Sequence, residues 1–531
     1  MDKKELKIEL LPAKTILKAQ VGDNLYGLLT RHGVLLEGDC GGRGTCRRCA
    51  VRLLKGNLSP STDEAAERAA FGEAAWIADW RLACMHDVQS DLMLYIPSVG
   101  DDKSKIDLQI RTIEAKEPLG PGLSLVVDVG TTSVAVGLVN ASTGAILGLD
   151  VCSNSQKAFG SDVVSRITYT EKNPLGLSQL QKVVWDDIEK LAVSLCDLAG
   201  VNAEEINTVI LAGNAVMSHL LWGMDPSSLA RAPFTPLILH AERKAGSALP
   251  LQLIKLKDVY LLPNIGGYIG SDTVAAMLAT NLIKWRESQE LTLLIDIGTN
   301  GELVLAGKGR LLAVSAAAGP AFEGAQISCG MRATAGAIYD VKINQDSLTP
   351  LVIGNGAPQG ICGSGLIAIA ARLLKCGLLD KSGRLSGNSP LISEGEDGRQ
   401  ILLGKSEDGK LIVLTQKDIR QLQLAKAAIR AASRMLLAVM GSKEEDIENL
   451  ILAGAFGAAI NPADALEIGL LPVVDIKKIS LAGNAAWEGA YKALIDNAFW
   501  LEAGQLARET EHINLSGNEE FSKFFIEDMK F

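Results

Sequence analysis

The residues of this chain that are best suited to chemistry are four cysteines in its N-terminal part. Cys40, Cys46 and Cys49 lie close together in the run DCGGRGTCRRCAV, and Cys84 follows in RLACMHD. Four thiolates can bind the irons of an iron–sulfur cluster or a single zinc ion in a closed tetrahedral site. The pattern therefore predicts a metal centre with three ligands on one loop and a fourth ligand on a later segment.

The glycines between these cysteines favour the iron–sulfur alternative. Gly41, Gly42 and Gly44 lie in the loop, and glycine lets a backbone pass close to inorganic sulfides. Zinc ribbons usually carry two C-x2-C pairs, whereas this loop has one pair and two single cysteines. The C-x5-C-x2-C spacing, with the fourth cysteine after thirty-four further residues, resembles that of ferredoxins with the longer first gap. The resemblance implies that all four cysteines bind a [2Fe-2S] cluster, which carries one electron.

The segments around the cysteines predict a small sheet domain. Residues 7–12 and 14–20 read as a β-hairpin, and the helix that follows is expected to be capped by Asp23. The apolar run at 92–97 is expected to close the sheet. We therefore expect residues 1–97 to form a ferredoxin-like β-grasp domain.

Two later segments share one plan and indicate a duplicated fold. Residues 125–139 (LVVDVGTTSVAVGLV) and 293–307 (LLIDIGTNGELVLAG) each combine an apolar strand, an aspartate, a Gly-Thr turn and a second strand. The aspartates, Asp128 and Asp296, are 168 residues apart, which fits two α/β lobes and not a short solenoid repeat. The expected boundaries are a polar linker at 98–123, a first lobe at 124–290 and a second lobe at 291–531.

The turn of each hairpin has residue types that hold phosphates. A carboxylate at the end of a strand can bind Mg²⁺, and the amides and hydroxyls of the turn can bind phosphate oxygens. A third segment, 450–472, begins with an apolar strand and turns through Gly454 and Gly457, where the missing side chains permit close contact with a base or ribose. The turn residues expected to contact phosphates are Gly130, Thr131, Thr132, Gly298, Thr299 and Asn300.

In this order, the three elements resemble the phosphate-1, phosphate-2 and adenosine motifs of the superfamily of acetate and sugar kinases, heat-shock chaperones and actin. The resemblance implies an actin-like ATPase fold that binds ATP and Mg²⁺. It also implies that Asp296 orients Mg²⁺ or the hydrolytic water, with Asp128 as the partner carboxylate across a cleft. Glu302 is a further candidate for the γ-phosphate side, the alternative being an ordinary acid beside a turn.

Two more segments fit this reading. Gly363 and Ser364 precede an apolar helical run, where the amides at a helix N-terminus can bind an anion; the alternative is a plain glycine turn with a serine cap. Residues 158–170 look like the helix that connects the two lobes, with Asp162 and Arg166 on one helical face.

Joined to a ferredoxin-like domain, these motifs resemble the ATP-dependent reductive activators of corrinoid proteins. The resemblance implies one-electron reduction of inactive Co(II) to Co(I) in a corrinoid protein, for a methyltransferase or O-demethylase system. A low-potential donor such as ferredoxin or flavodoxin is implied, and a homodimer is possible. Longer members carry an additional middle domain, which we expect this chain to lack because Asp128 follows the linker almost at once. The alternatives are an activator of another low-potential enzyme, of the 2-hydroxyacyl-CoA dehydratase type, and a non-redox actin-like or chaperone ATPase.

The composition of the chain argues against two classes of binding partner. The formal charge of −10, from 52 basic and 62 acidic residues, argues against nucleic acid as the main partner. The apolar stretches are broken before membrane-spanning length, so we expect no membrane partner and a cytoplasmic location. Phe521, Phe524, Phe525 and Met529 follow a helical spacing near the C-terminus, which predicts a helix that packs on the core.

The five remaining cysteines favour buried, reduced thiols. Each lies in an apolar or glycine-rich segment without the paired spacing of a metal site. Activators of 2-hydroxyacyl-CoA dehydratases hold a [4Fe-4S] cluster between two subunits, and by that analogy Cys329 or Cys362 is a weaker alternative ligand. The others are Cys152, Cys196 and Cys376.

Overall fold

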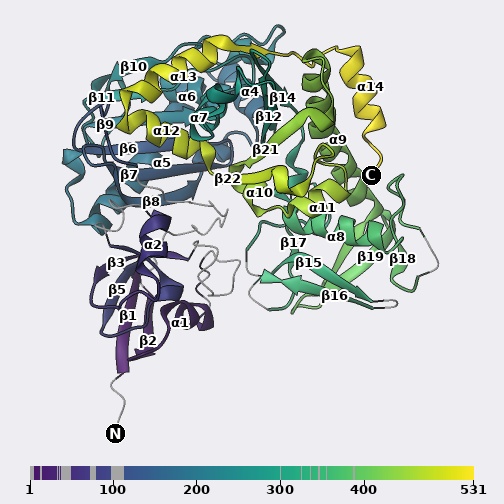
Figure 1. Cartoon of the computed structure of the whole chain (residues 1–531), viewed down its shortest axis with the longest axis horizontal. Helices are drawn as coiled ribbons and strands as arrows, with labels where there is room; N and C mark the ends of the chain where they lie inside the picture. The colour runs from purple at the N-terminus through teal and green to yellow at the C-terminus, as the bar shows by residue number, and fades with distance from the viewer. Residues whose placement is uncertain are drawn as a thin grey trace. The chain divides into compact units, whose positions relative to one another are not determined.

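The computed structural model divides into two compact units, each described by itself below. The first comprises Met1–Asp102, Asp107–Ala279 and Ala486–Ala507, and the second comprises Lys103–Ile106, Thr280–Ala485 and Arg508–Phe531. The chain is drawn in Figure 1. The residues that the structure describes are 5–11, 15–32, 34, 36, 49–71, 79–96, 113–298, 300–324, 326–334, 336–344, 347–353, 356–386 and 389–531. Three predicted site residues lie outside these ranges: Cys40, Cys46 and Thr299.

The N-terminal domain contains a five-stranded sheet in the order β2-β1-β5-β3-β4. Its first two strands form the predicted antiparallel hairpin, and the predicted apolar run contributes a strand that lies between the first and third strands, parallel to the first. Alternate side chains of the first strand are buried, as expected for a sheet with one face in a core. The strands are β1 (Glu5–Leu11), β2 (Thr15–Gln20), β3 (Ala50–Lys55), β4 (Trp80–Leu82) and β5 (Leu92–Tyr95).

The predicted cap of the first helix is wrong by one residue. Helix α1 (Leu25–Arg31) is capped by Asn24, whose side-chain oxygen accepts a hydrogen bond from the amide of Gly27. Asp23 instead accepts a hydrogen bond from the amide of Gln20 at 2.8 Å and so closes the preceding turn. Both residue types are good caps, and the tight turn takes the first of them.

The first lobe is built on a six-stranded sheet in the order β10-β11-β9-β6-β7-β8. A three-stranded antiparallel meander, which contains the first Asp-Gly-Thr hairpin, is joined to two strands that run parallel to its first strand and to an antiparallel edge strand. The strands are β6 (Leu123–Val129), β7 (Ser133–Asn140), β8 (Ala145–Ser153), β9 (Thr208–Gly213), β10 (Glu242–Ala245) and β11 (Asp258–Leu261).

Helices pack on this sheet through large and small side chains that fit together. Trp487 of α12 (Ala485–Ile495) donates a hydrogen bond to the carbonyl of Val126 at 3.1 Å, and any side chain at Gly137 would overlap its ring. Helix α4 (Val163–Lys172) begins after Asp162, which caps it. The prediction that Asp162 and Arg166 share a helical face is therefore wrong, because Asp162 precedes the helix. The other main helices are α5 (Gly176–Ala199), α6 (Ala215–Trp222), α7 (Ser271–Ala279) and α13 (Asn497–Glu509).

The second lobe repeats the same plan, which confirms the predicted duplication. Its main sheet has the order β22-β21-β12-β13-β14-β23, with an antiparallel meander and two strands parallel to the first strand of the meander. The strands are β12 (Leu291–Ile297), β13 (Gly301–Gly307), β14 (Arg310–Ala316), β21 (Ile447–Ala453), β22 (Ile479–Gly483) and β23 (Thr510–His512). Two small three-stranded sheets are added: β15 (Ala337–Asn344), β16 (Ser347–Val352) and β17 (Gly360–Ile361), then β18 (Ile392–Gly395), β19 (Gly398–Lys405) and β20 (Leu411–Thr415).

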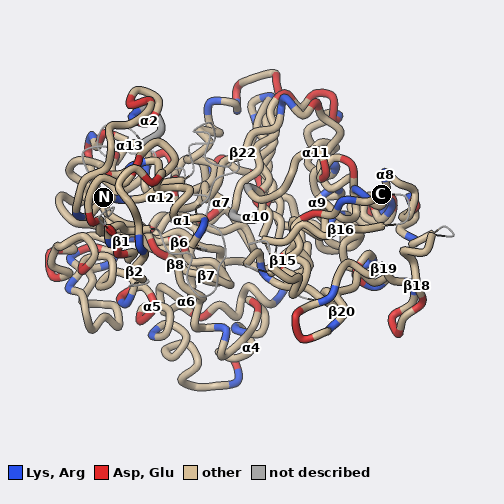
Figure 2. Tube along the Cα trace, turned by 90° about the horizontal axis from the view of Figure 1, so that it is seen from below, with Lys and Arg blue, Asp and Glu red and all other residues tan. Residues whose placement is uncertain are grey.

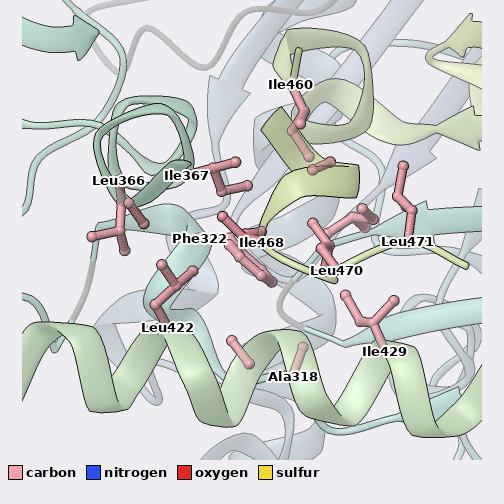
Figure 3. Packing of buried hydrophobic residues seen from close by; sticks show 14 of the residues in the cluster. Ala318, Phe322, Leu366, Ile367, Leu422, Ile429, Ile460, Ile468, Leu470 and Leu471 are labelled. Atoms are coloured by element: carbon pink, nitrogen blue, oxygen red, sulfur yellow. The ribbon is translucent and has the colours of Figure 1, made fainter. Parts of the chain in front are cut away.

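The core of this lobe is centred on the long helix α9 (Gln416–Val439). Leu422 points from the helix toward Phe322, and Ile429 points from it toward Leu470, as Figure 3 shows. Phe322 stacks on Phe456 with 5.0 Å between the ring centroids. Helix α8 (Gly363–Lys375) adds apolar side chains to the same cluster, and α10 (Gly454–Ala459) and α11 (Pro462–Glu467) follow strand β21. Burial of this apolar surface stabilises the lobe that carries the second hairpin.

Basic and acidic residues are interspersed along the chain, as the blue and red segments of Figure 2 show. Among the described residues, no helix is long and apolar enough to cross a membrane.

The C-terminal helix α14 (Glu519–Glu527) packs against α9, as its apolar spacing predicted. The Arg434 guanidinium lies 4.1 Å from the ring centroid of Phe524 and pairs with Glu527 and Asp528. Lys426 of α9 is 1% exposed and donates a hydrogen bond to the carbonyl of Lys530. The last residues of the chain are thereby bonded to the long core helix.

The buried lysine generates a prediction about stability. Burial lowers the pKa of Lys426 to about 8 from its ordinary value of 10.5. Between these two values the unfolded chain binds the proton more tightly than the folded chain, so the free energy of unfolding rises with pH across that window. We expect Lys426→Met to remove part of this rise, up to about 3 kcal/mol, in urea unfolding measured at pH 7.5 and pH 10.

Lys417→Met is the matched control, because Lys417 lies on the same helix and is 62% exposed. The control should keep the pH dependence of the wild-type chain. An equal rise in the Lys426→Met variant would contradict the prediction.

Candidate functional site

Two of the four predicted cluster ligands lie in the described part of the chain, and their thiols converge. Cys49 directly precedes β3, and Cys84 lies in a short 3-10 helix (Ala83–Met85) directly after β4. The antiparallel pairing of β3 with β4, and a hydrogen bond from the amide of Ala83 to the carbonyl of Cys49, bring the two Sγ atoms to 3.2 Å. This geometry fits two ligands of one metal centre; the roles of Cys40 and Cys46 stay predictions.

A buried pair of polar side chains holds the segment that carries Cys84. Glu67 is fully buried and accepts hydrogen bonds from the amide of Leu82 and from His86 Nε2, which lies 3.0 Å from both carboxylate oxygens. His86 Nδ1 faces the carbonyl of Ser59 at 2.7 Å. Burial disfavours the charged form of Glu67, but the hydrogen bonds from His86 and Leu82 outweigh it and lower the pKa of this carboxyl. The Glu67–His86 pair therefore holds the backbone on both sides of Cys84.

The first half-site is the predicted phosphate turn at residues 128–132, which lies at the carboxyl ends of β6 and β9. Asp128 is opposite Ala212 in the parallel pair, so the residues that follow the two strands meet at one edge of the sheet. Asn214, two residues further along, donates a hydrogen bond from its side chain to the Thr131 hydroxyl at 3.0 Å. Gly130 donates its amide to the carbonyl of Ser133 at 2.9 Å and closes the turn.

The second half-site has an acid opposite its aspartate. Asp296 of β12 is directly opposite Glu302 of β13, so the two side chains lie on the same face of the sheet. Ser315 donates a hydrogen bond to Glu302 at 3.2 Å. Gly298 and Asn300 form the turn, where the amide of Gly298 donates to the carbonyl of Asn300. In the first lobe the residue opposite Asp128 is Ala135, so the paired acids occur in the second lobe and the two hairpins differ at this position.

The two glycines of the third motif have different environments. Gly454 follows the strand paired with β12 and has φ +81°, and a side chain there would overlap the Asp296 carboxylate. At Gly457 an added Cβ would meet its nearest atom at 3.6 Å, an ordinary contact. The close approach that Gly454 permits is thus made to Asp296. Contact with a base or ribose stays a prediction for both glycines.

Gly363 begins helix α8, which confirms the predicted helix start. A side chain at Gly363 would overlap the carbonyl of Phe322, so packing alone requires glycine there. Ser364 Oγ lies 3.4 Å from Cys362 Sγ. Cys362 is the N-cap residue and makes no side-chain capping hydrogen bond, so the serine cap of the alternative interpretation is not formed. Anion binding at this helix start stays a prediction.

Sequence reasoning missed two polar residues of the first half-site. Asn214 ends the run LAGN, which occurs at 211–214 and again at 481–484, and this repeat was the available signal. Asp272 lies in the first turn of α7, next to Ser271, whose hydroxyl bonds to the backbone of Gly213. Burial raises the pKa of Asp272 to about 6. The hydrogen bond that its carboxyl accepts from Thr273 acts in the opposite direction and lowers the pKa.

The buried Glu67–His86 pair predicts a large effect of a small substitution. Glu67→Gln removes the charged acceptor of the hydrogen bonds from His86 and Leu82, and hydrogen bonds to a charged group contribute about 1.5–3 kcal/mol each. We expect the variant to lose the visible absorption of its predicted cluster at lower guanidinium concentration than the wild-type chain does.

Glu64→Gln on the same helix, α2 (Glu64–Phe71), is the matched control. Glu64 forms an exposed pair with Arg68 at 2.9 Å, and such pairs contribute about 0.5 kcal/mol or less. Equal effects of the two substitutions would show that the buried pair does not hold the Cys84 segment.

Three family models cover nearly the whole chain. The model described as the 2Fe-2S iron-sulfur cluster binding domain matches residues 8–89, the RACo middle region matches 123–285, and the C-terminal domain of RACo, the ASKHA domain, matches 290–531. The expectation that the chain lacks a middle domain is therefore wrong, because the residues predicted as the first lobe match that region. These domains support a [2Fe-2S] cluster and ATP binding.

Individual relatives agree with the family models. The corrinoid activation enzyme RamQ of Eubacterium limosum is 33% identical over 434 residues, which are 79% of this chain and 72% of the relative. The [Co(II) methylated amine-specific corrinoid protein] reductase of Methanosarcina barkeri is 29% identical over 298 residues, 52% of each chain. A solved structure, the reductive activator for corrinoid, iron-sulfur protein, is 32% identical with a TM-score of 0.69 and covers 99% of this chain and 98% of its own. The chain therefore belongs to the RACo family of corrinoid activators.

Proposed function

We propose that this chain is an ATP-hydrolysing reductase that returns the cobalt of a corrinoid protein from Co(II) to Co(I), one electron at a time. The observation that carries the proposal is the presence, in one chain of this family, of converging cluster thiols at Cys49 and Cys84 and of two Asp-Gly hairpins in a duplicated ATPase fold. When bound, a [2Fe-2S] cluster supplies single electrons. The methyl transfer system served by the corrinoid protein is that of a methyltransferase or O-demethylase.

Coupling to ATP has a physical reason. Moving an electron to an acceptor of lower potential costs about 2.3 kcal/mol for each 100 mV. A chain that only shuttled electrons would leave such an acceptor largely oxidised. Nucleotide binding and hydrolysis by the two-lobed domain supply the free energy that the electron transfer lacks.

The residues of the second half-site are assigned to the chemistry of hydrolysis. Asp296 and Glu302, on one face of their hairpin, hold Mg²⁺ or the attacking water, because carboxylate oxygens suit a small hard cation. Asp128 is the partner carboxylate from the first lobe. The residues that contact nucleotide are Gly130, Thr131, Thr132, Gly298, Thr299, Asn300, Gly363, Ser364, Gly454 and Gly457.

The remaining partners follow from the same proposal. A low-potential ferredoxin or flavodoxin donates the electron to the cluster held by the four N-terminal cysteines. The protein works in the cytoplasm.

The proposal predicts ATP-dependent formation of Co(I). The iron–sulfur-loaded chain is mixed anaerobically with a Co(II) corrinoid protein and a low-potential reductant, and Co(I) is followed by its absorption. We expect Co(I) to accumulate with ATP and to stay near the baseline without it. Asp296→Asn should lower the ATP-dependent rate by about tenfold or more, because the variant loses a carboxylate charge at the second half-site.

Persistence of Co(II) in the complete mixture would contradict the proposal and favour an activator of another low-potential enzyme. A colourless zinc protein would exclude both redox functions. ATPase activity that does not respond to a corrinoid protein would favour the non-redox alternative.

Gly454 provides a sharper prediction about the nucleotide half of the function. Gly454→Ala places a methyl group against the Asp296 carboxylate and forces an alanine to φ +81°. We expect the ATP hydrolysis rate to fall by about tenfold or more, because small displacements of a catalytic group have effects of this size. Gly441→Ala, which also places an alanine at a positive φ of +63° but meets nothing within 4 Å, is the matched control and should keep the wild-type rate. Equal ATP hydrolysis rates for the two variants would contradict the role assigned to the contact between Gly454 and the Asp296 carboxylate.

A further inference from the structure

Buried groups donate hydrogen bonds to the backbone carbonyls of the first phosphate loop, residues 130–132. The carbonyl of Gly130 accepts a hydrogen bond from Asn154 Nδ2 at 2.9 Å, and the carbonyl of Thr132 accepts one from the Asn154 amide at 2.9 Å. Between them, the carbonyl of Thr131 accepts a hydrogen bond from Arg166 Nη2 at 2.6 Å. Three consecutive carbonyl groups are thus held toward the interior of the lobe.

This arrangement fixes the direction of the loop amides. In a trans peptide the N–H group points opposite to the carbonyl of the same peptide unit. With the carbonyls of Gly130 and Thr131 turned inward, the amides of Thr131 and Thr132 point away from the buried network. Successive amides that point the same way make a concave site for an anion.

Arg166 brings a positive charge to the rear of this loop. The residue is fully buried in α4. Within the described ranges, its guanidinium hydrogen bonds reach four uncharged groups: the carbonyls of Gly160 and Thr131, the Gln156 amide oxygen and the Met217 sulfur. Burial lowers its pKa to about 10, and the attraction of Asp162 opposes this shift, so the group stays protonated at neutral pH.

The acid that raises the pKa of Arg166 has its own hydrogen-bond partner. Asp162 is exposed, and its carboxylate accepts the amide of Ser165 as the cap of α4. A buried cation whose bonded partners are all uncharged is costly unless a negative charge arrives nearby. The loop amides point away from Arg166. An anion that binds to these amides is stabilised by the positive charge behind the loop.

We propose that Arg166 is a positioning residue that fixes the first phosphate loop and gives the first lobe its affinity for the polyphosphate of the nucleotide without a metal ion. This role of Arg166 rests on the proposed ATP-dependent function and adds detail to its nucleotide site. It also divides the labour between the lobes. The loop amides of the first lobe bind phosphate and are backed by a buried cation, whereas Asp296 and Glu302 of the second lobe, with Asp128 as their partner carboxylate, suit the metal ion.

The wild-type chain offers a first test that needs no variant. Inorganic tripolyphosphate, added in the presence of EDTA, should raise the melting temperature of the first unit, because phosphate binds the loop without a divalent cation. An unchanged melting temperature at millimolar tripolyphosphate would overturn the proposal.

Substitution of the arginine tests the residue itself. Arg166→Met should abolish the tripolyphosphate effect and weaken ATP binding by about tenfold or more, while the affinity for adenosine stays unchanged. Arg166→Lys keeps a charge without the planar fork and should give an intermediate loss. Arg231→Met, which removes an exposed arginine of the same lobe, is the matched control and should behave as the wild-type chain.

The ratio of the affinities for ATP and adenosine separates positioning from general damage. A purely structural role of Arg166 would lower both affinities together, and that result would overturn the proposal. If the variants lose ATP affinity selectively while the wild-type chain fails to form Co(I), the inference stands and the proposed function falls. If the wild-type chain forms Co(I) but the variants bind ATP normally, only the inference falls.

Discussion

The parallel pairing of two strands in each lobe is the constraint on which both half-sites depend. The aspartate near the end of the first strand lies opposite an alanine of a strand that comes much later in the sequence: Asp128 opposite Ala212 and Asp296 opposite Ala453. Parallel strands carry the residues that follow them to the same edge of the sheet. Asn214 therefore reaches Thr131, and Gly454 comes against the Asp296 carboxylate. A shift in either pairing would separate these groups although each local turn stayed intact.

The sequence was most informative where chemistry depends on a local turn. The two Asp-Gly-Thr hairpins and the helix start at Gly363 were predictable because each lies within a few residues, and the duplication was visible because the same local pattern occurs twice. The contacts of Gly454 and Asn214 were not, because they join segments that are far apart in the chain. Asn214 left a trace in the repeated LAGN run, but only the sheet register explains what that repeat positions.

Close competition between similar residues accounts for the local errors. Asp23 and Asn24 both suit a helix cap, and the choice between them depends on the turn that Gln20 closes. Asp162 lies one residue before its helix, so its side chain serves the helix amides and not the face that carries Arg166. In both cases the pattern identified the correct segment, and a shift of one position changed what the residue does.

Two buried cations of this chain, Lys426 and Arg166, donate hydrogen bonds to backbone carbonyl oxygens, and the two arrangements have different consequences. Lys426 donates to the carbonyl of Lys530 and binds the C-terminal segment to a core helix, and burial lowers its pKa to about 8. Arg166 keeps its proton more firmly, with a pKa of about 10, and its planar guanidinium reaches several partners at once. A lysine has one compact ammonium group, so it could not hold Gly160, Gln156 and Thr131 in a single plane. Where a loop has to be both rigid and positively charged, the chemistry of arginine is therefore the one that fits, whereas a lysine suffices to hold the chain terminus.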